Sequence, residues 1–106
     1  MFIVIETSSD SKSTCDNISQ NLLKSKLSPC ISISNKSNSS YIWNEKVISS
    51  KEHTIRIKCL KNDKKQIIDI IKNLHNYSTP EIISYDINIL DKKYDEWFKK
   101  SLDKND

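Results

Sequence analysis

The chain contains no glycine among its 106 residues. Glycine supplies positive φ angles and close backbone approach at no steric cost, and several phosphate-binding and catalytic loops depend on it. Its absence excludes a Gly-rich phosphate loop, a G-x-G-x-x-G dinucleotide turn, a G-x-S-x-G nucleophile elbow and a standard EF-hand loop. Every turn must be built from other residues, and the usual nucleotide-dependent enzymes are poor candidates.

The length and charge predict one small domain covering residues 1–106, with the last few residues as a disordered tail. Basic residues number 17 and acidic residues 14, and the two kinds are interspersed along the chain. Nucleic-acid binding requires a concentrated basic face. The sequence therefore argues against a nucleic-acid partner.

Three cysteines occur, at Cys15, Cys30 and Cys59, and no two form a C-x-x-C pair. An odd count without that spacing argues against a disulfide framework or a zinc ribbon, so free buried thiols are expected. No stretch reaches the roughly 20 apolar residues of a membrane span. A cytoplasmic protein without a membrane span is predicted.

The apolar pattern predicts four strands and three helices. Strands are expected at 2–7, 30–43, 47–60 and 82–89, with an irregular or looped part at 35–40, and helices at 13–28, 63–75 and after a cap at Asp91. The β-α-β-β-α-β order is the ferredoxin-like pattern, an α+β fold with a four-stranded antiparallel sheet covered on one face by two helices. The other face would be bare in a monomer, so self-association is expected.

Two strand-like runs flank Asn44 and Glu45, as in a β-hairpin with a two-residue turn. Such turns favour glycine, and asparagine visits positive φ more readily than most residues. We therefore expect the hairpin to form with a different turn or a small local strain.

Five pieces of the chain, in order and at nearly the right separations, resemble the CutA divalent-cation tolerance proteins. They are residues 26–30 (K-L-S-P-C, similar to K-L-A-A-C), 39–46 (S-S-Y-I-W-N-E-K, similar to S-x-Y-x-W-x-G-K), Glu52 with Lys58, 75–81 (H-N-Y-S-T-P-E, similar to H-P-Y-x-x-P-E) and 94–97 (Y-D-E-W, similar to Y-L-x-W). The resemblance implies a ferredoxin-like homotrimer with an extra C-terminal helix and a long hairpin around Trp43 that contacts other subunits. It also implies a link to divalent-metal tolerance, with copper binding in some members, and a fold-level analogy to signalling trimers.

His75 is the best candidate metal ligand, because imidazole suits copper and zinc, and Glu81 lies past a Pro-containing turn that could fold back toward it. The competing interpretation is a structural turn whose polar groups cap the helix. The resemblance also implies, for copper-binding members, a cysteine at the end of the first strand and one or two histidines at the end of the second helix. This chain has no cysteine near Glu6 or Thr7, and the residue before His75 is Leu74, so only one of these ligands carries over. Cu²⁺ or another divalent cation stays a hypothesis for this chain.

Trp43, Lys58, Tyr77 and Glu81 match the family's polar and aromatic set around a cleft between subunits. A lysine among aromatic side chains could hold an anion or a carboxylate. The alternative for Trp43 is trimer packing, since Trp is enriched in interfaces. The remaining candidates are expected to have structural roles. We expect Tyr94, Trp97 and Phe98 to make core or subunit contacts, Cys30 to be a buried small residue and His53 to be an exposed strand residue.

Two functions remain open. The first is a metal-responsive binding or signalling trimer with His75 as a ligand; the second is a scaffolding trimer that anchors an unidentified protein partner without a direct metal site. An enzyme is the weakest interpretation, because no nucleophile–base pair is visible and the chain has only two histidines.

Overall fold

The structure of the protein is a computed structural model, and it describes residues 1–103; the predicted C-terminal tail lies outside the described residues. The elements along the chain are β1 (Phe2–Ser9), α1 (Lys12–Lys24), β2 (Cys30–Ile33), β3 (Ser37–Trp43), β4 (Lys46–Leu60), a 3₁₀ turn (Lys61–Asp63), α2 (Lys64–Leu74), β5 (Ile82–Ile87) and α3 (Lys92–Ser101). This confirms the predicted β-α-β-β-α-β order with an added terminal helix. The segment predicted as 30–43 is two strands, separated by a short break at residues 34–36.

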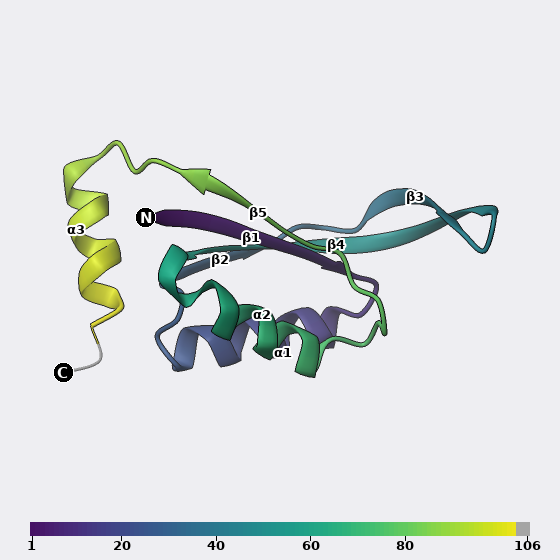
Figure 1. Ribbon diagram of the computed structural model, residues 1–106, viewed down its shortest axis with the longest axis horizontal. Coiled ribbons are helices and arrows are strands. Elements are labelled where there is room, and N and C mark those ends of the chain that lie inside the picture. The colour runs from purple at the N-terminus through teal and green to yellow at the C-terminus, as the bar shows by residue number, and fades with distance from the viewer. Residues whose placement is uncertain (104–106) are drawn as a thin grey trace.

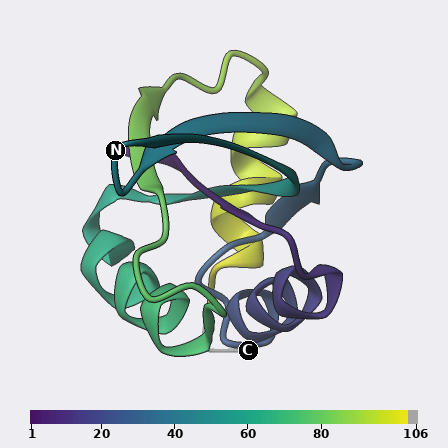
Figure 2. The same cartoon turned by 90° about the vertical axis from the view of Figure 1, so that its right-hand side faces the viewer.

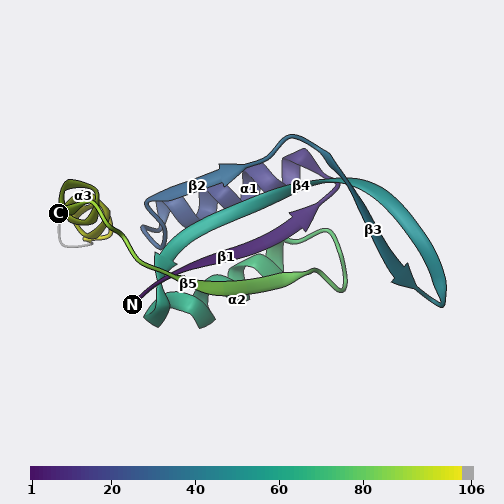
Figure 3. The same ribbon diagram turned by 90° about the horizontal axis from the view of Figure 1, so that it is seen from above.

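The strands form an antiparallel sheet in the order β2-β4-β1-β5, and β3 continues it by pairing with β4 (Figures 1 and 3). Helices α1 and α2 lie side by side on one face, as Figure 2 shows along the long axis. Helix α3 stands at the end of the sheet near the N-terminus (Figure 1). There Phe98 is fully buried and meets Phe2 edge to face, with ring centroids 5.1 Å apart.

Isoleucine dominates the core between the helices and the sheet. The buried cluster consists of Ile3, Ile5, Cys15, Ile18, Leu22, Leu27, Ile55, Ile57, Cys59, Ile67 and Ile71. Alternate residues of β1 and β4 point to this side, and helical spacing places the others on the inward faces of α1 and α2. The chain thus builds a full core without alanine or glycine.

The chain makes its tight turns with non-glycine residues at positive φ. Asn44 (φ 50°) and Glu45 (φ 64°) form the two-residue turn between β3 and β4, where Trp43 pairs with Lys46. Positive φ at both central residues is the requirement of a type I′ hairpin turn. The prediction of a surviving hairpin with an unusual turn is confirmed.

Helix α1 ends at Lys24, four residues before the predicted end, in a motif that normally uses glycine. Lys26 has φ 57°, its N–H donates to the Leu23 carbonyl at 3.1 Å, and the Leu27 N–H donates to the Leu22 carbonyl at 3.0 Å. These are the two hydrogen bonds of a Schellman motif, with lysine at the position that favours glycine. Burial of Leu22 and Leu27 stabilises the turn.

Residues 37–52, called the arm below, are β3 and the first part of β4, and they project beyond the helix-covered body (Figure 1). The arm makes the molecule elongated, with dimensions of 48 × 26 × 23 Å. Its radius of gyration is 14.8 Å, compared with about 13 Å for a compact domain of this length. Tyr41, Ile42, Trp43 and Val47 are exposed on it.

Candidate functional site

The arm joins the body at one point of β4, and several polar groups gather there. Ser9 pairs with His53 at the last position of the β1–β4 ladder, and Ser37 pairs with Glu52 at the first position of the β3–β4 ladder. Adjacent residues of β4 therefore belong to different ladders. The loop after α2, residues 75–81, comes to the same place through hydrogen bonds to the end of β1.

A chain of hydrogen bonds connects this loop to β1 and β4. The Ser9 hydroxyl donates to Asn76 Oδ1 at 2.6 Å, and Asn76 Nδ2 donates to Asp10 Oδ1 at 2.9 Å. The Tyr77 hydroxyl accepts from the Asp10 N–H at 3.0 Å and donates to Glu52 Oε2 at 2.5 Å. These contacts span the end of β1, the loop and the base of the arm, so they fix the three segments relative to one another.

Both ring nitrogens of His75 are used within the protein. Nε2 lies 3.0 Å from the Ser8 carbonyl oxygen, and the Tyr77 N–H donates to Nδ1 at 3.0 Å. A carbonyl only accepts and an N–H only donates, so the ring must be neutral with its proton on Nε2. Burial lowers the pKa of His75, and the hydrogen bond to Ser8 partly offsets that effect.

Glu52 is a carboxylate with only 8% of its surface exposed. Burial raises the pKa of Tyr77, and its hydrogen bond to Glu52 raises the pKa further. The phenol therefore stays protonated and acts as a donor to the carboxylate. No ion pair to Glu52 occurs within residues 1–103, and the side-chain hydrogen bond that its carboxylate accepts there comes from the Tyr77 hydroxyl.

A cleft of about 730 Å³, called the junction cleft below, lies between the arm and residues 77–81. Its wall includes Ser8, Tyr41, Trp43, Glu52, Tyr77 and Glu81. Trp43, Tyr77 and Glu81, three of the four residues predicted around a cleft between subunits, lie at this cleft within one subunit. The cleft between subunits stays a prediction. The volume of the junction cleft lies within the range of small-molecule sites.

Lys58, the fourth predicted cleft residue, lies elsewhere in the subunit. It pairs with Val4 and Cys30 in the sheet, and its Nζ donates to the Tyr94 hydroxyl at 3.2 Å. The same ammonium lies 5.3 Å from the centre of the Tyr94 ring. Within one subunit, Lys58 therefore stabilises the packing of α3 against the sheet.

The predicted metal residues do not fit a metal ion as they are arranged. Neither His75 nitrogen has a free lone pair, because Nε2 carries the proton and Nδ1 already accepts from Tyr77. Glu81 is exposed, and no hydrogen bond joins it to His75 in the described part of the chain. Within residues 1–103 no three His, Cys, Asp or Glu side chains gather as a metal site would require.

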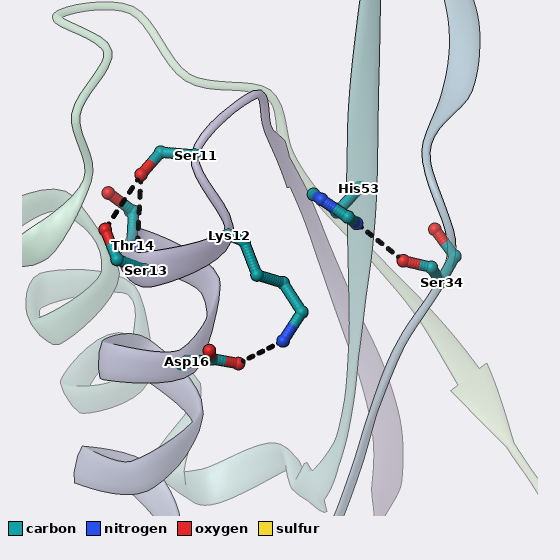
Figure 4. Close-up of polar contacts among 7 residues, drawn as sticks. All are labelled: Ser11, Lys12, Ser13, Thr14, Asp16, Ser34 and His53. Carbon is teal, nitrogen blue, oxygen red and sulfur yellow. Dashed lines mark hydrogen bonds and ion pairs between the residues drawn. The ribbon is translucent and has the colours of Figure 1, made fainter.

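His53 is buried, which corrects the expectation that it is exposed. Only 9% of its surface is accessible, and its Nδ1 lies 2.8 Å from the Ser34 carbonyl oxygen (Figure 4). At this position β4 pairs with β1 on one side, and Ser34, in the segment between β2 and β3, contacts the ring through its carbonyl oxygen. Figure 4 also shows Ser11, whose hydroxyl accepts from the Thr14 N–H at 3.2 Å and begins α1.

The three cysteines are free, and two of them are buried. Burial raises the pKa of Cys15, and it raises the pKa of Cys59 to about 12. The reactive form of cysteine is the thiolate, so neither buried thiol is an activated nucleophile. Cys30 is half-buried rather than buried as expected, because β2 is an edge strand of the sheet.

Sequence reasoning did not single out Glu52, Asp10 and Asn76 as interacting residues. Glu52 follows a polar stretch of β4 whose composition gives no sign of burial, and only its spacing to Lys58 marked it. Asp10 and Asn76 are more than sixty positions apart and meet because the loop after α2 is hydrogen-bonded to the end of β1.

The fold and the site define the class of protein: a small ferredoxin-like α+β protein with a projecting hairpin arm and a polar cleft at its base. No helix in residues 1–103 is both long and apolar enough to cross a bilayer. A sequence model of the CutA1 divalent ion tolerance proteins matches residues 3–101. The chain belongs to that family.

Individual relatives cover almost the whole chain. The divalent-cation tolerance protein CutA of Yersinia pestis (strain Pestoides F) is 26% identical over 100 residues, which are 94% of this chain and 84% of that protein. CutA1 from Oryza sativa has a TM-score of 0.90 at 27% identity, covering 98% of this chain and 95% of the other. The periplasmic divalent cation tolerance protein CutA from Archaeoglobus fulgidus has the same fold, with a TM-score of 0.91 at 24% identity over 97% and 100% of the two chains.

Proposed function

We propose that the chain acts as a homotrimeric divalent-cation tolerance protein without catalytic activity, in which the arm holds the subunits together. The observation that carries the trimer is the exposed apolar surface of the arm. Ile42 and Val47 are 75% and 80% exposed, and Tyr41 and Trp43 are nearly half exposed. Ile42 and Val47 are paired on one face of the arm, and Tyr41 and Trp43 project from the other. Exposed apolar groups of this kind are typical of interfaces between proteins.

Light scattering coupled to size-exclusion chromatography tests the assembly. We expect a mass of three times the 12.3 kDa subunit for the wild type. Ile42→Asp should reduce the mass to that of the subunit, because an interface would bury the new charge without a partner. Leu90→Asp, at a 94% exposed position outside the arm, is the matched control and should leave the trimer intact. A wild type that elutes at the subunit mass would refute the trimer.

Direct binding of Cu²⁺ or another divalent cation at His75 is one form of the metal response. It requires His75 to lose its hydrogen bond to Ser8 or to Tyr77 and to recruit ligands such as Glu81. The second candidate is a scaffolding trimer whose link to metals is indirect, and the use of both His75 nitrogens favours it. A signalling role follows only by analogy of fold.

Calorimetric titration of the demetallated protein with Cu²⁺ and Zn²⁺ separates the two forms. Direct binding predicts stoichiometric heat that His75→Ala abolishes and that His53→Ala, the control for the other histidine, retains. A titration without heat would leave the scaffold, whose protein partner should then be recovered with the wild type and lost with an arm variant such as Trp43→Ala.

The free thiols also support a cytoplasmic location, since cytosolic reductants keep cysteines reduced. The Archaeoglobus fulgidus relative is described as periplasmic, which is a statement about that protein. Cell fractionation with antibody detection tests the location of this chain, and recovery with an extracytoplasmic fraction would refute it.

A further inference from the structure

A closed ring of three subunits needs two different contact surfaces on each subunit. A patch that meets its own copy closes a dimer, whereas a head-to-tail contact between two different patches can close a ring. The exposed apolar residues of the arm supply one of these surfaces. The surface that receives the arm therefore lies elsewhere on the subunit.

The arm has an open strand edge. Along residues 46–52, β4 pairs with β3 alone, and β1 joins β4 only from His53 onward. On the other edge of this stretch the backbone N–H and C=O groups have no strand partner within residues 1–103. Val47, in this stretch, is 80% exposed. Open edges of this kind pair readily with a strand of another chain.

Strand β5 is an open edge of the body. It pairs with β1 alone, over Ile82–Ile87, and lies at the margin of the sheet (Figure 3). Lysine and proline commonly protect such an edge, and β5 contains neither. Ile83 and Tyr85 are 47% and 39% exposed on it. β2, at the opposite margin, is only four residues long, and shortness itself protects an edge. β5 is therefore the edge of the body that most needs a covering strand.

The charges at these two edges are complementary in sign and in spacing. Lys46 and Lys51 lie five positions apart on the arm, and Glu81 and Asp86 lie five positions apart along β5 and the residue before it. In the described chain neither lysine has an ion pair, nor has Glu81, and the one formed by Asp86 is a 3.8 Å contact between exposed groups, with Lys61. An antiparallel alignment that places Lys46 opposite Asp86 also places the second lysine opposite Glu81. Opposite charges at facing positions stabilise a strand pair.

We propose that the arm adds a strand to the sheet of the neighbouring subunit, with residues 46–51 antiparallel to residues 81–86 of the next copy. This pairing rests on the proposed trimer and names the surface that receives the arm. Backbone hydrogen bonds supply the attraction, and the two charge pairs fix the register. The open edge of β3 carries no charged residue and has nothing to fix a register in this way. Two arms paired antiparallel at the same edge would place Lys46 opposite Lys51, so like charges disfavour a dimer of arms.

Disulfide formation between introduced cysteines tests the contact. The proposed alignment places Ser49 opposite Ile83 of the next copy. We therefore expect Ser49→Cys/Ile83→Cys, treated with diamide, to form covalent dimers and trimers on a non-reducing gel. Cys30→Ser in the same chain removes the half-buried native thiol, and the other two native thiols are buried. Ser49→Cys/Leu90→Cys is the matched control, with its second cysteine at an exposed position beyond β5, and it should remain at the subunit mass.

Light scattering of the same variants before oxidation separates the strand pairing from the trimer itself. A mass of three subunits without a disulfide in Ser49→Cys/Ile83→Cys would overturn the strand pairing and leave the trimer in place. A disulfide in the single variant Ser49→Cys would show contact between two arms and would also overturn it. A subunit mass for the wild type would overturn both proposals.

Charge reversal tests the register. Lys46→Glu/Lys51→Glu places like charges opposite each other in every interface, so the chain concentration at which the trimer dissociates should rise by roughly ten-fold or more. Adding Glu81→Lys/Asp86→Lys to the same chain exchanges the signs and should restore assembly to near the wild-type level. If the fourfold variant dissociates as readily as the arm variant, or if the arm variant assembles as the wild type does, the proposed alignment is wrong.

Discussion

The body and the arm share one strand but differ in what covers it. β4 runs from Lys46 to Leu60; in its first six residues every side chain is at least partly exposed, whereas from Glu52 onward most are buried or half-buried. The alternating pattern is similar in both parts, but only the second part is covered by α1 and α2 (Figure 1). The difference shows that β propensity is enough to form a strand, and that burial depends on a second layer of structure.

The largest expected effect is in the body. Ile57→Ala removes a fully buried side chain from the core and should lower the free energy of unfolding by about 2–5 kcal/mol. Urea denaturation at fixed chain concentration measures it. Ile42→Ala makes the same change on the arm, where the side chain is 75% exposed. Within the subunit it should cost no more than about 0.5 kcal/mol, so any larger loss measures contact with another subunit. If Ile57→Ala and Ile42→Ala lowered the free energy of unfolding equally, at low and at high chain concentration, the body and the arm would not differ in this respect.

A smaller effect is expected at the tip of the arm. Glu45→Gly relieves a positive φ of 64°, a conformation that costs a non-glycine residue roughly 1–2 kcal/mol. Glycine also has greater conformational freedom in the unfolded chain, and this offsets about 0.4–1 kcal/mol of the stabilisation. We expect a net gain of roughly 0.5–1 kcal/mol in the free energy of unfolding.

Lys46→Gly is the matched control for that variant. Lys46 follows directly in the strand and is not among the residues with positive φ, so glycine there should destabilise the protein. If Glu45→Gly leaves the free energy of unfolding unchanged, the arm unfolds separately from the body, and the two regions are independent units.

The smallest effect is expected where the regions meet. Burial lowers the pKa of His75 below its unfolded value of about 6.5. Below that pH the unfolded chain binds more protons than the folded one, so stability should be complete above about pH 6.5 and fall as the pH decreases. Denaturation midpoints between neutral and mildly acidic pH measure the slope, and His75→Gln should flatten it. A slope that persists in His75→Gln would assign the effect to other groups.

Much of the fold was predictable because hydrophobic periodicity is a local property. The strand at residues 2–7, the helical stripe of Ile67 and Ile71, and the Asp91 cap were all read correctly, and the cap hydrogen bond to Tyr94 measures 2.9 Å. The helix end at Lys24 was placed too late, because the stop is a Schellman turn at Lys26 rather than the later proline. A lysine gives no sign of positive φ, whereas a glycine would have marked the turn.

The candidate site was only partly predictable. Trp43, Tyr77 and Glu81 could be grouped by their resemblance to a known family, and they do share a cleft. Within one subunit Lys58 lies away from this cleft and donates to Tyr94, a contact that depends on the packing of α3, and its place in a cleft between subunits stays a prediction. The hydrogen bonds of His75 could not be predicted from the sequence either, because its two partners are a carbonyl in β1 and an N–H of its own loop.

The sequence by itself determined the secondary-structure order, the sheet topology class, the isoleucine core and the hairpin without glycine. These features follow from side-chain periodicity and backbone preference, which act over a few residues. Only the tertiary structure decided that Glu52 and His53 are buried, that both His75 nitrogens are occupied and that Trp43, Tyr77 and Glu81 lie at one cleft within the subunit. Those properties depend on which distant groups meet, and burial and hydrogen bonding between distant segments are fixed only when the chain has packed.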